Sequence, residues 1–243
     1  VSRAYAEMSN RAALLVAARA LEKPDLAIGL VVGATPSGMY ECLGRLSYSG
    51  AADLSAAHFL LFDEFFGSVA AAPHPHRRAL VDALFRDAGV PDEHVHGPDA
   101  RLAPAEASAA YAESIRLRPP DLLVLGAGTG GDIGWNTALT PRTTGLHVVD
   151  LAGRPEKAAG FTKAVTMGPA NILAAGEILL LAAGRNKADL VRRLVTGDES
   201  AENCVAAIVR NHPRAFLLVD AEAASLLPKD QDAHPAKTSD FRI

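Results

Sequence analysis

The sequence predicts an α/β protein, a single domain with a mostly parallel open sheet and helices on both faces. Apolar runs of strand length alternate with amphipathic segments of helical length, the order typical of parallel sheets. Several of these runs end in glycine-rich turns, as at residues 33–38 and 126–131. The 243 residues are enough for one large core and contain no linker or repeat, so we expect residues 1–243 to form one domain.

Each predicted element has a local signal. Residues 9–23 have helical apolar spacing that Pro24 ends, and 104–117 are alanine-rich and amphipathic. A tight Gly/Pro turn at 34–38 precedes a helix at 39–47, and two further helices are expected, one continuing through residue 85 and one at 186–195. Strands are expected at 26–33, 58–67, 121–128, 145–151, 161–168 and 215–220. Residues 169–182 predict a helix, or a helix that leads into a strand at 177–184.

Composition excludes several classes of function. Hydrophobic residues make up 49% and charged residues 21%, which indicates a globular protein. The net charge of −4 gives no electrostatic signature of nucleic-acid or membrane-surface binding, so neither partner is expected. Two cysteines, Cys42 and Cys204, in apolar helical contexts are typical of a reduced protein, and no signal peptide is recognised. We therefore expect a cytoplasmic protein.

Three strand ends carry unusual residues. In open α/β sheets ligands bind beyond the carboxyl ends of the strands, so the turn at 33–38, the pair Asp63–Glu64 and the loop at 126–132 should converge. Gly33, Ala34 and Thr35 precede a helix N-terminus, which suits an anion, although a plain capped turn is an equal alternative. Asp63 and Glu64 end an apolar strand, where a carboxylate can act as a general base or cap a nearby loop.

The third loop permits a competing interpretation. Gly126, Gly128 and Gly131 match the G-x-G-x-x-G pattern after a strand, and Asp150 follows about twenty residues later, as in a dinucleotide site. Residues 132–145 would nevertheless make a poor crossover helix, and this fingerprint is usual at a first strand. A dinucleotide-dependent oxidoreductase is therefore the weakest hypothesis, and no cofactor is predicted.

The histidines give weak signals. His74 with His76, and His94 with His96, lie in polar, proline-bearing loops and have no third nearby ligand, so they are expected to be solvated, with no metal site. His212 precedes Pro213 ahead of the last expected strand and is expected to be structural.

Five segments together resemble the glucosamine-6-phosphate deaminase and 6-phosphogluconolactonase family. They occur in the family's order with comparable spacing, and the resemblance covers almost the whole chain. The most specific is the glycine-rich segment DLLVLGAGTGGDIGWNTALT at 121–140. The others are GLVVGATPSGMY, LLFDEFFG, AVTMGPANILAAGEILLLAAGRNKADLV and NHPRAFLLVD. The resemblance implies a Rossmann-like sheet, a phosphorylated sugar as ligand and possible assembly as a homo-oligomer.

The resemblance also implies roles for individual residues. Asp63 matches the carboxylate that moves a proton between C1 and C2 of the open-chain sugar, which makes it a catalytic residue. The other residues that the resemblance and the strand-end loops place against the substrate are Gly33, Ala34, Thr35, Glu64, Gly128, Gly130, Gly131, Asn136, Thr137 and Lys187, with Arg154 or Lys157 near a phosphate-binding arginine.

Three positions depart from the family pattern together. The family motif has Asp, His and Glu where this chain has Gly130, Asp132 and Thr137. An aspartate is ordinarily ionised at neutral pH, so Asp132 is a poor acid for opening a sugar ring, although it remains a candidate catalytic residue that could bind a cation or an amino group. We therefore expect a sugar-phosphate or amino-sugar-phosphate isomerase or deaminase with a non-standard substrate or reaction. A non-catalytic phosphosugar-binding protein is the main alternative.

Overall fold

A six-stranded parallel sheet forms the centre of the protein in the computed structural model, which describes residues 1–67, 74–152, 160–197 and 204–228. The strand order is β4-β2-β1-β5-β8-β9, and each neighbouring pair is parallel. The strands are β1 (Ala27–Leu30), β2 (His58–Leu61), β4 (Val95–His96), β5 (Leu122–Gly126), β8 (Glu177–Ala182) and β9 (Ala215–Val219). The structure therefore confirms the predicted mostly parallel α/β fold.

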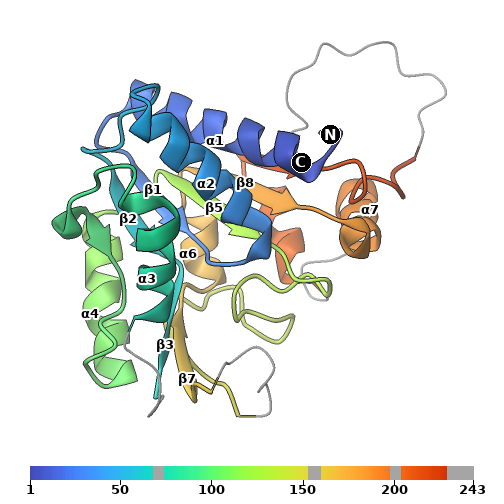
Figure 1. The fold of residues 1–243 in the computed structure, drawn as a ribbon. Helices are drawn as coiled ribbons and strands as arrows, with labels where there is room; N and C mark the ends of the chain where they lie inside the picture. The colour runs from blue at the N-terminus through green and yellow to red at the C-terminus, as the bar shows by residue number, and fades with distance from the viewer. Residues whose placement is uncertain (68–73, 153–159, 198–203, 229–243) are drawn as a thin grey trace.

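Helices cover both faces of this sheet (Figure 1). Successive side chains of a strand point to opposite faces, so Ile28 and Leu30 pack in one core while Leu123 and Leu125 pack in the other. The first face carries α1 (Tyr5–Glu22), α2 (Ala34–Tyr48) and α3 (Pro75–Leu80), the last continued by a π-helical turn (Val81–Phe85). The second carries α4 (Pro104–Leu117), α6 (Pro169–Leu173) and α7 (Ala188–Thr196). Short 3₁₀ helices lie at Asp92–His94, Arg185–Lys187 and Val205–Asn211.

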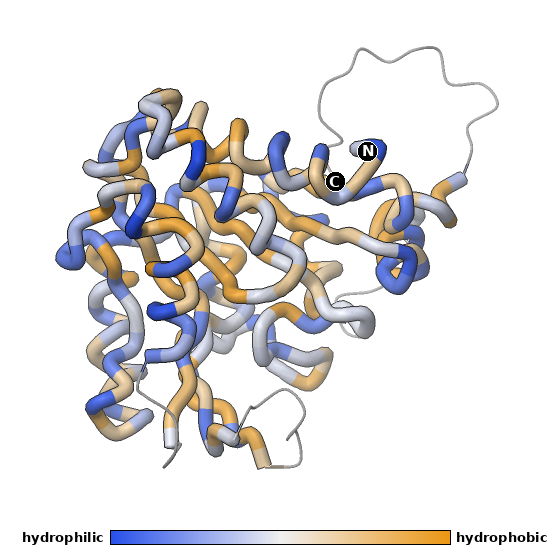
Figure 2. Tube along the Cα trace, in the orientation of Figure 1, coloured by the Kyte–Doolittle hydropathy of each residue, from blue (hydrophilic) through white to orange (hydrophobic). Residues whose placement is uncertain are grey.

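Hydropathy follows these layers. Apolar colouring runs along the central strands (Figure 2), and the buried apolar side chains come from these strands and from the helices that cover them. The strands β5 and β8 are buried almost throughout, as expected for parallel strands covered on both faces. No helix within the described ranges is long and apolar enough to cross a lipid bilayer.

A second, three-stranded antiparallel sheet is the main departure from the predicted arrangement. It contains β3 (Asp63–Phe66), β7 (Lys163–Thr166) and β6 (His147–Asp150) in the order β3-β7-β6. The strand expected at 58–67 is thus divided at Phe62, whose N–H donates to Leu30 O while its carbonyl accepts from Met167 N, both at 2.8 Å. Asp63 is therefore the first residue after the chain leaves the large sheet.

Two element boundaries also differ from expectation. Helix α2 begins at Ala34, so it includes the Gly/Pro segment predicted as a turn; Pro36 is tolerated because first-turn amides have no helical acceptor. Residues 169–182 form a helix followed by a strand, the second of the two alternatives.

Candidate functional site

A cavity of about 860 Å³ lies at the carboxyl ends of the central strands. The first turn of α2, Asp63 and the loop after β5 all line it, so the three predicted loops do converge. A fourth contributor follows β8, where Asn186 and Lys187 line the cavity.

One end of the cavity presents helix amides and a lysine. Gly33, Ala34 and Thr35 line it at the N-terminus of α2, whose first-turn N–H groups have no intrahelical acceptor. The Nζ atom of Lys187 donates to Ala127 O at 2.6 Å, which holds the ammonium group against the loop after β5. Backbone amides, a helix dipole and an ammonium group together favour an anion at this end.

Asp63 lies against His76. The Asp63 side chain belongs to a residue that is only 4% exposed, yet it lines the cavity. Its Oδ1 lies 2.8 Å from Nδ1 of His76, and its backbone carbonyl lies 3.1 Å from the same nitrogen. No hydrogen bond within the described ranges engages Oδ2, which leaves that oxygen available to a ligand.

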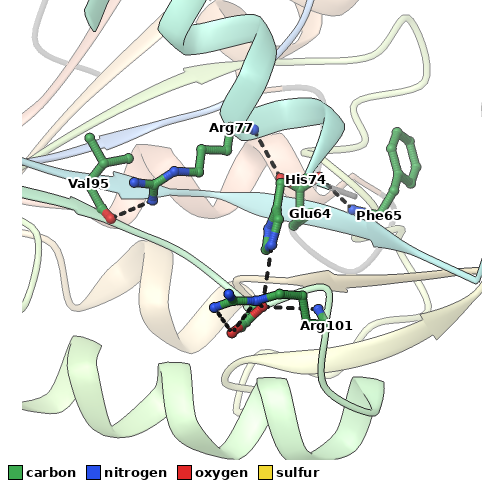
Figure 3. Close-up of polar contacts among 7 residues, drawn as sticks. Glu64, Phe65, His74, Arg77, Val95 and Arg101 are labelled. Atoms are coloured by element: carbon green, nitrogen blue, oxygen red, sulfur yellow. Dashed lines mark hydrogen bonds and ion pairs between the residues drawn. The ribbon is translucent and has the colours of Figure 1, made fainter. Parts of the chain in front are cut away.

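Glu64 fixes the start of α3. It is fully buried, and its Oε1 accepts from the N–H groups of Phe65 and His76 at 2.9 and 3.0 Å. Its Oε2 accepts from Arg77 N at 3.0 Å, while the Arg77 guanidinium donates to Val95 O at 2.7 Å (Figure 3). Glu64 therefore supports the site as a cap rather than as a ligand, one of the two roles that the sequence allowed.

The pKa of His76 reflects these neighbours. Burial by itself would lower the pKa, but the charges of Asp63 and Glu64 and the hydrogen bonds to Asp63 outweigh burial and raise the pKa to about 9. His76 is therefore an imidazolium ion at neutral pH.

Two buried tyrosines also respond to Asp63. The pKa values of Tyr40 and Tyr111 are raised first by burial and then by the charge of Asp63, so both remain neutral hydrogen-bond donors, Tyr40 to Val31 O and Tyr111 to Leu61 O.

The loop after β5 is built largely from its own backbone. Gly128 N donates to Asp132 O at 2.7 Å and Gly131 N to Gly128 O at 2.9 Å. Gly131 has φ of 86°, and a Cβ there would lie 2.1 Å from Sγ of Cys204, so glycine is required on both grounds. Gly128 and Asp132 line the cavity.

Several predicted ligand-binding residues lie elsewhere. Asn136 is fully buried, and its Nδ2 donates to Ile133 O and Met167 O, so it ties the loop to the end of β7. Thr137 bonds within its own turn, through its N–H to Thr140 Oγ1 and through its Oγ1 to Leu139 N. Gly130 and Gly131 do not line the cavity. Arg154 and Lys157 lie outside the described residues.

The histidine predictions were partly wrong. His76 was expected to be solvated, but its side chain is only 13% exposed and lines the cavity. The position of His76 at the cavity could not be predicted from a proline-bearing loop, although Pro75, at a helix start eleven residues after Glu64, was a usable signal. His94 and His96 were also expected to be solvated, but both rings pack against His58, that of His96 stacked and that of His94 tilted. His212 is buried and bonds to Ala175 O at 2.8 Å, so its expected structural role is confirmed.

A second hollow of about 550 Å³ lies beside α3, lined by residues that include His74, Arg77 and Arg101. Its cations already have carboxylate partners, since Arg77 pairs with Asp92 and Arg101 with Asp99. In addition, its lining includes no residue from the N-terminus of a helix as long as α2. The larger cavity is therefore the candidate site, and in the described part of the chain no cluster of three metal-ligating side chains lies in it or elsewhere.

The dinucleotide interpretation finds no support in the topology. Strand β5 lies between β1 and β8, whereas Asp150 ends β6 in the other sheet. Asp150 is exposed and its Oδ1 accepts from Ala152 N at 2.8 Å. The acidic residue and the glycine loop are thus not carried by neighbouring strands, as that site requires.

Comparison with known proteins identifies the family. The family model of glucosamine-6-phosphate isomerases/6-phosphogluconolactonase matches residues 2–217. Glucosamine-6-phosphate deaminase of Halothermothrix orenii is 36% identical over 92% of this chain and 97% of its own length, and that of Alkaliphilus oremlandii is 34% identical over the same shares.

Solved structures agree with this assignment. A monomeric glucosamine-6-phosphate deaminase superposes with a TM-score of 0.84 at 31% identity, over 92% of this chain and 97% of the other. The 6-phosphogluconolactonase of Thermotoga maritima superposes with a TM-score of 0.72 at 22% identity, over 90% and 97%, which shows a shared fold. The chain therefore belongs to the family of glucosamine-6-phosphate isomerases and 6-phosphogluconolactonases, whose named members are enzymes.

Proposed function

We propose that this protein is a sugar-phosphate or amino-sugar-phosphate isomerase or deaminase in which Asp63 transfers a proton between C1 and C2 of an open-chain substrate. The observation that carries the proposal is the position of Asp63, buried at the wall of the cavity with one carboxylate oxygen bonded to His76 and the other unbonded within the described ranges. One carboxylate serves both carbons because they lie on the same side of a cis-enediol or enolamine. Relatives with about a third of their residues identical are named deaminases.

Different parts of the cavity suit different groups of a phosphosugar. The α2 N-terminus and Lys187 suit a phosphate group at one end, since amides and an ammonium group both favour a dianion. Asp63, His76 and Asp132 provide charged groups elsewhere on the wall. A phosphorylated sugar anchored at the first end would present its reactive carbons to Asp63, which is the geometric requirement for a general base.

The substrate or reaction is non-standard for the family. At the three positions where the resemblance implies an Asp, a His and a Glu, this chain has Gly130, Asp132 and Thr137. Asp132 lines the cavity but, as a carboxylate, accepts protons rather than donating them. Two arrangements would compensate for the missing ring-opening acid: a substrate that reaches the site with its ring already open, or an acid supplied by another residue.

Isotope exchange tests the proposal. The protein is incubated in D₂O with glucosamine 6-phosphate, fructose 6-phosphate and other phosphosugars, and deuterium at C1 and C2 is followed by NMR. We expect exchange with at least one sugar and a loss of about 10³-fold in Asp63→Asn, within the range for removal of a general base. Asp25→Asn is the matched control, because Asp25 is exposed ahead of β1 at the opposite edge of the sheet.

Two outcomes would contradict the proposal. Exchange that persists in Asp63→Asn would assign the base to another group. Chemical-shift changes on binding without exchange for any sugar would indicate a phosphosugar-binding protein, a function that the three changed motif positions would then explain.

A further inference from the structure

The His76 imidazole is held with one nitrogen toward Asp63 and its ring at the cavity wall. Its backbone N–H is fixed by Glu64 and its Nδ1 by Asp63. The Phe65 ring meets the imidazole edge to face, with centroids 4.5 Å apart. Backbone, ring nitrogen and ring face are thus each constrained by β3, so the orientation of Nε2 is set before any ligand binds.

The two ring nitrogens of His76 differ in their hydrogen-bond partners. Within the described ranges no hydrogen bond engages Nε2, whereas Nδ1 lies within bonding distance of two oxygens of Asp63. The bond to an acceptor places a proton on Nδ1, and the two carboxylates of β3 favour a second proton on the ring. Nε2 therefore carries a transferable proton at neutral pH.

The other charged groups of the cavity cannot readily fill this role. Asp63 and Asp132 are carboxylates, which accept protons. Lys187 lines the cavity from the segment after β8, where its ammonium group donates to Ala127 O. Glu64 is a fully buried residue of β3 and accepts hydrogen bonds from three backbone N–H groups. His76 is thus the group of the described cavity wall whose chemistry and position suit a general acid.

We infer that His76 is a catalytic acid that opens the ring of a cyclic phosphosugar before the proton transfer by Asp63. The Nε2 proton passes to the ring oxygen as the bond between that oxygen and C1 breaks. The proton of the C1 hydroxyl passes to the Asp132 carboxylate as the C1=O bond forms. The products are the open-chain aldehyde, neutral His76 and protonated Asp132, so atoms and charge balance, and the two residues exchange protons with solvent before the next turnover.

This inference rests on the proposed function, but it can be tested separately. Ring opening and closing interconverts the α and β anomers, and this requires no transfer between C1 and C2. Magnetisation-transfer NMR on glucosamine 6-phosphate and glucose 6-phosphate measures that interconversion at pH 6, where a histidine of ordinary pKa is mostly protonated. The proteins compared are wild type, His76→Asn, Asp63→Asn and the control His94→Asn, whose ring lies outside the cavity lining.

We expect wild type to accelerate anomer exchange and His76→Asn to lose about 10²-fold of that acceleration, since the asparagine amide can replace the Nδ1 bond to Asp63 but has no acidic proton. Asp63→Asn should lose deuterium exchange at C1 and C2, and His94→Asn should keep both deuterium exchange and anomer exchange. Two results would overturn the role of His76. One is anomer exchange in His76→Asn at the wild-type rate. The other is that wild type accelerates anomer exchange of no phosphosugar that it binds.

A second measurement separates acid chemistry from positioning. If His76 donates the proton, the rate of anomer exchange in wild type falls as pH rises through about 9, and this alkaline limb is absent from the residual rate of His76→Asn. Asp63, Glu64, Asp132 and Lys187 are the other charged groups near the ring, and all four are retained in the variant. A purely positioning role would leave the alkaline limb in place.

Discussion

The two sides of the cavity wall are built in opposite ways. On the α3 side, the buried residues Glu64 and Asp63 hold the backbone and ring of the half-buried His76 through hydrogen bonds of 2.8–3.1 Å. On the side of the loop after β5, the chain is held mainly by its own backbone and by glycines, and the Asp132 side chain makes no hydrogen bond in the described part of the chain. Preorganised polar groups favour catalysis, which is consistent with the proposed base Asp63 and the inferred acid His76 both lying on the α3 side.

The changed motif positions lie on the loop side of this comparison. The resemblance implies an acid–base group in the loop, and this chain has glycine, aspartate and threonine there. A Cβ at Gly130 would meet nothing within 4 Å, so contacts at this position do not require a glycine. The absence of the implied aspartate is therefore not forced by packing, and it is consistent with an acid placed on another element.

The largest effect on stability is expected from the charge of His76. A histidine whose pKa is raised on folding contributes its full stabilisation below the unfolded pKa of about 6.5 and loses it as pH rises through about 9. The advantage of wild type over His76→Asn, on the order of 3 kcal/mol at most, should thus decline between these pH values. Urea unfolding from pH 6 to pH 9.5 measures it, and Asp63→Asn should flatten the same slope.

A result independent of pH would show that the α3 side is not held by charge. The comparison would then reduce to packing, and the role inferred for His76 would lose its electrostatic basis.

Two adjacent glycines test the loop side. Gly131→Ala should destabilise the protein by about 3 kcal/mol, because it combines a left-handed backbone with a collision against Cys204 Sγ. Gly130→Ala is the matched control and should change the free energy of unfolding by less than about 0.5 kcal/mol, since its Cβ would enter open space. Adding Cys204→Ala to Gly131→Ala should recover part of the loss.

If the two alanine variants unfold alike, the loop does not have the packing described, and the contrast between the two sides fails.

The smallest effect is expected from Glu64→Gln. Glutamine keeps one acceptor oxygen but turns an NH₂ group toward a backbone N–H, so the stability should fall by about 1–2 kcal/mol. The activity of the folded variant should also fall, because the start of α3 sets the position of His76. Glu113→Gln is the control: its side chain is 56% exposed and pairs with Arg116, so its removal should cost less than about 0.5 kcal/mol. If the two substitutions lowered the stability equally, the hydrogen bonds of Glu64 would not be what holds the start of α3 in place.

Much of the fold follows from local patterns, but the small sheet does not. The apolar runs that became β1, β5 and β8 are long and bounded by turns, so periodicity identifies them. The division of residues 58–67 at Phe62 depends on pairing with Met167, about a hundred residues later, which no local signal contains. The position of Asp63 at the cavity could be predicted because Asp63 ends an apolar run. The Asp63–His76 contact could not, because it is set by tertiary structure.

Deuterium exchange at C1 and C2 in Asp63→Asn, compared side by side with Asp132→Asn, tests most directly whether the base lies on the α3 side. The two variants remove one carboxylate from each side of the same cavity. We expect Asp63→Asn to lose about 10³-fold of the exchange, while Asp132→Asn loses about tenfold or less with a substrate whose ring opens spontaneously. The opposite order, with exchange surviving the loss of Asp63 but not that of Asp132, would place the base in the loop after β5 and contradict the assignment.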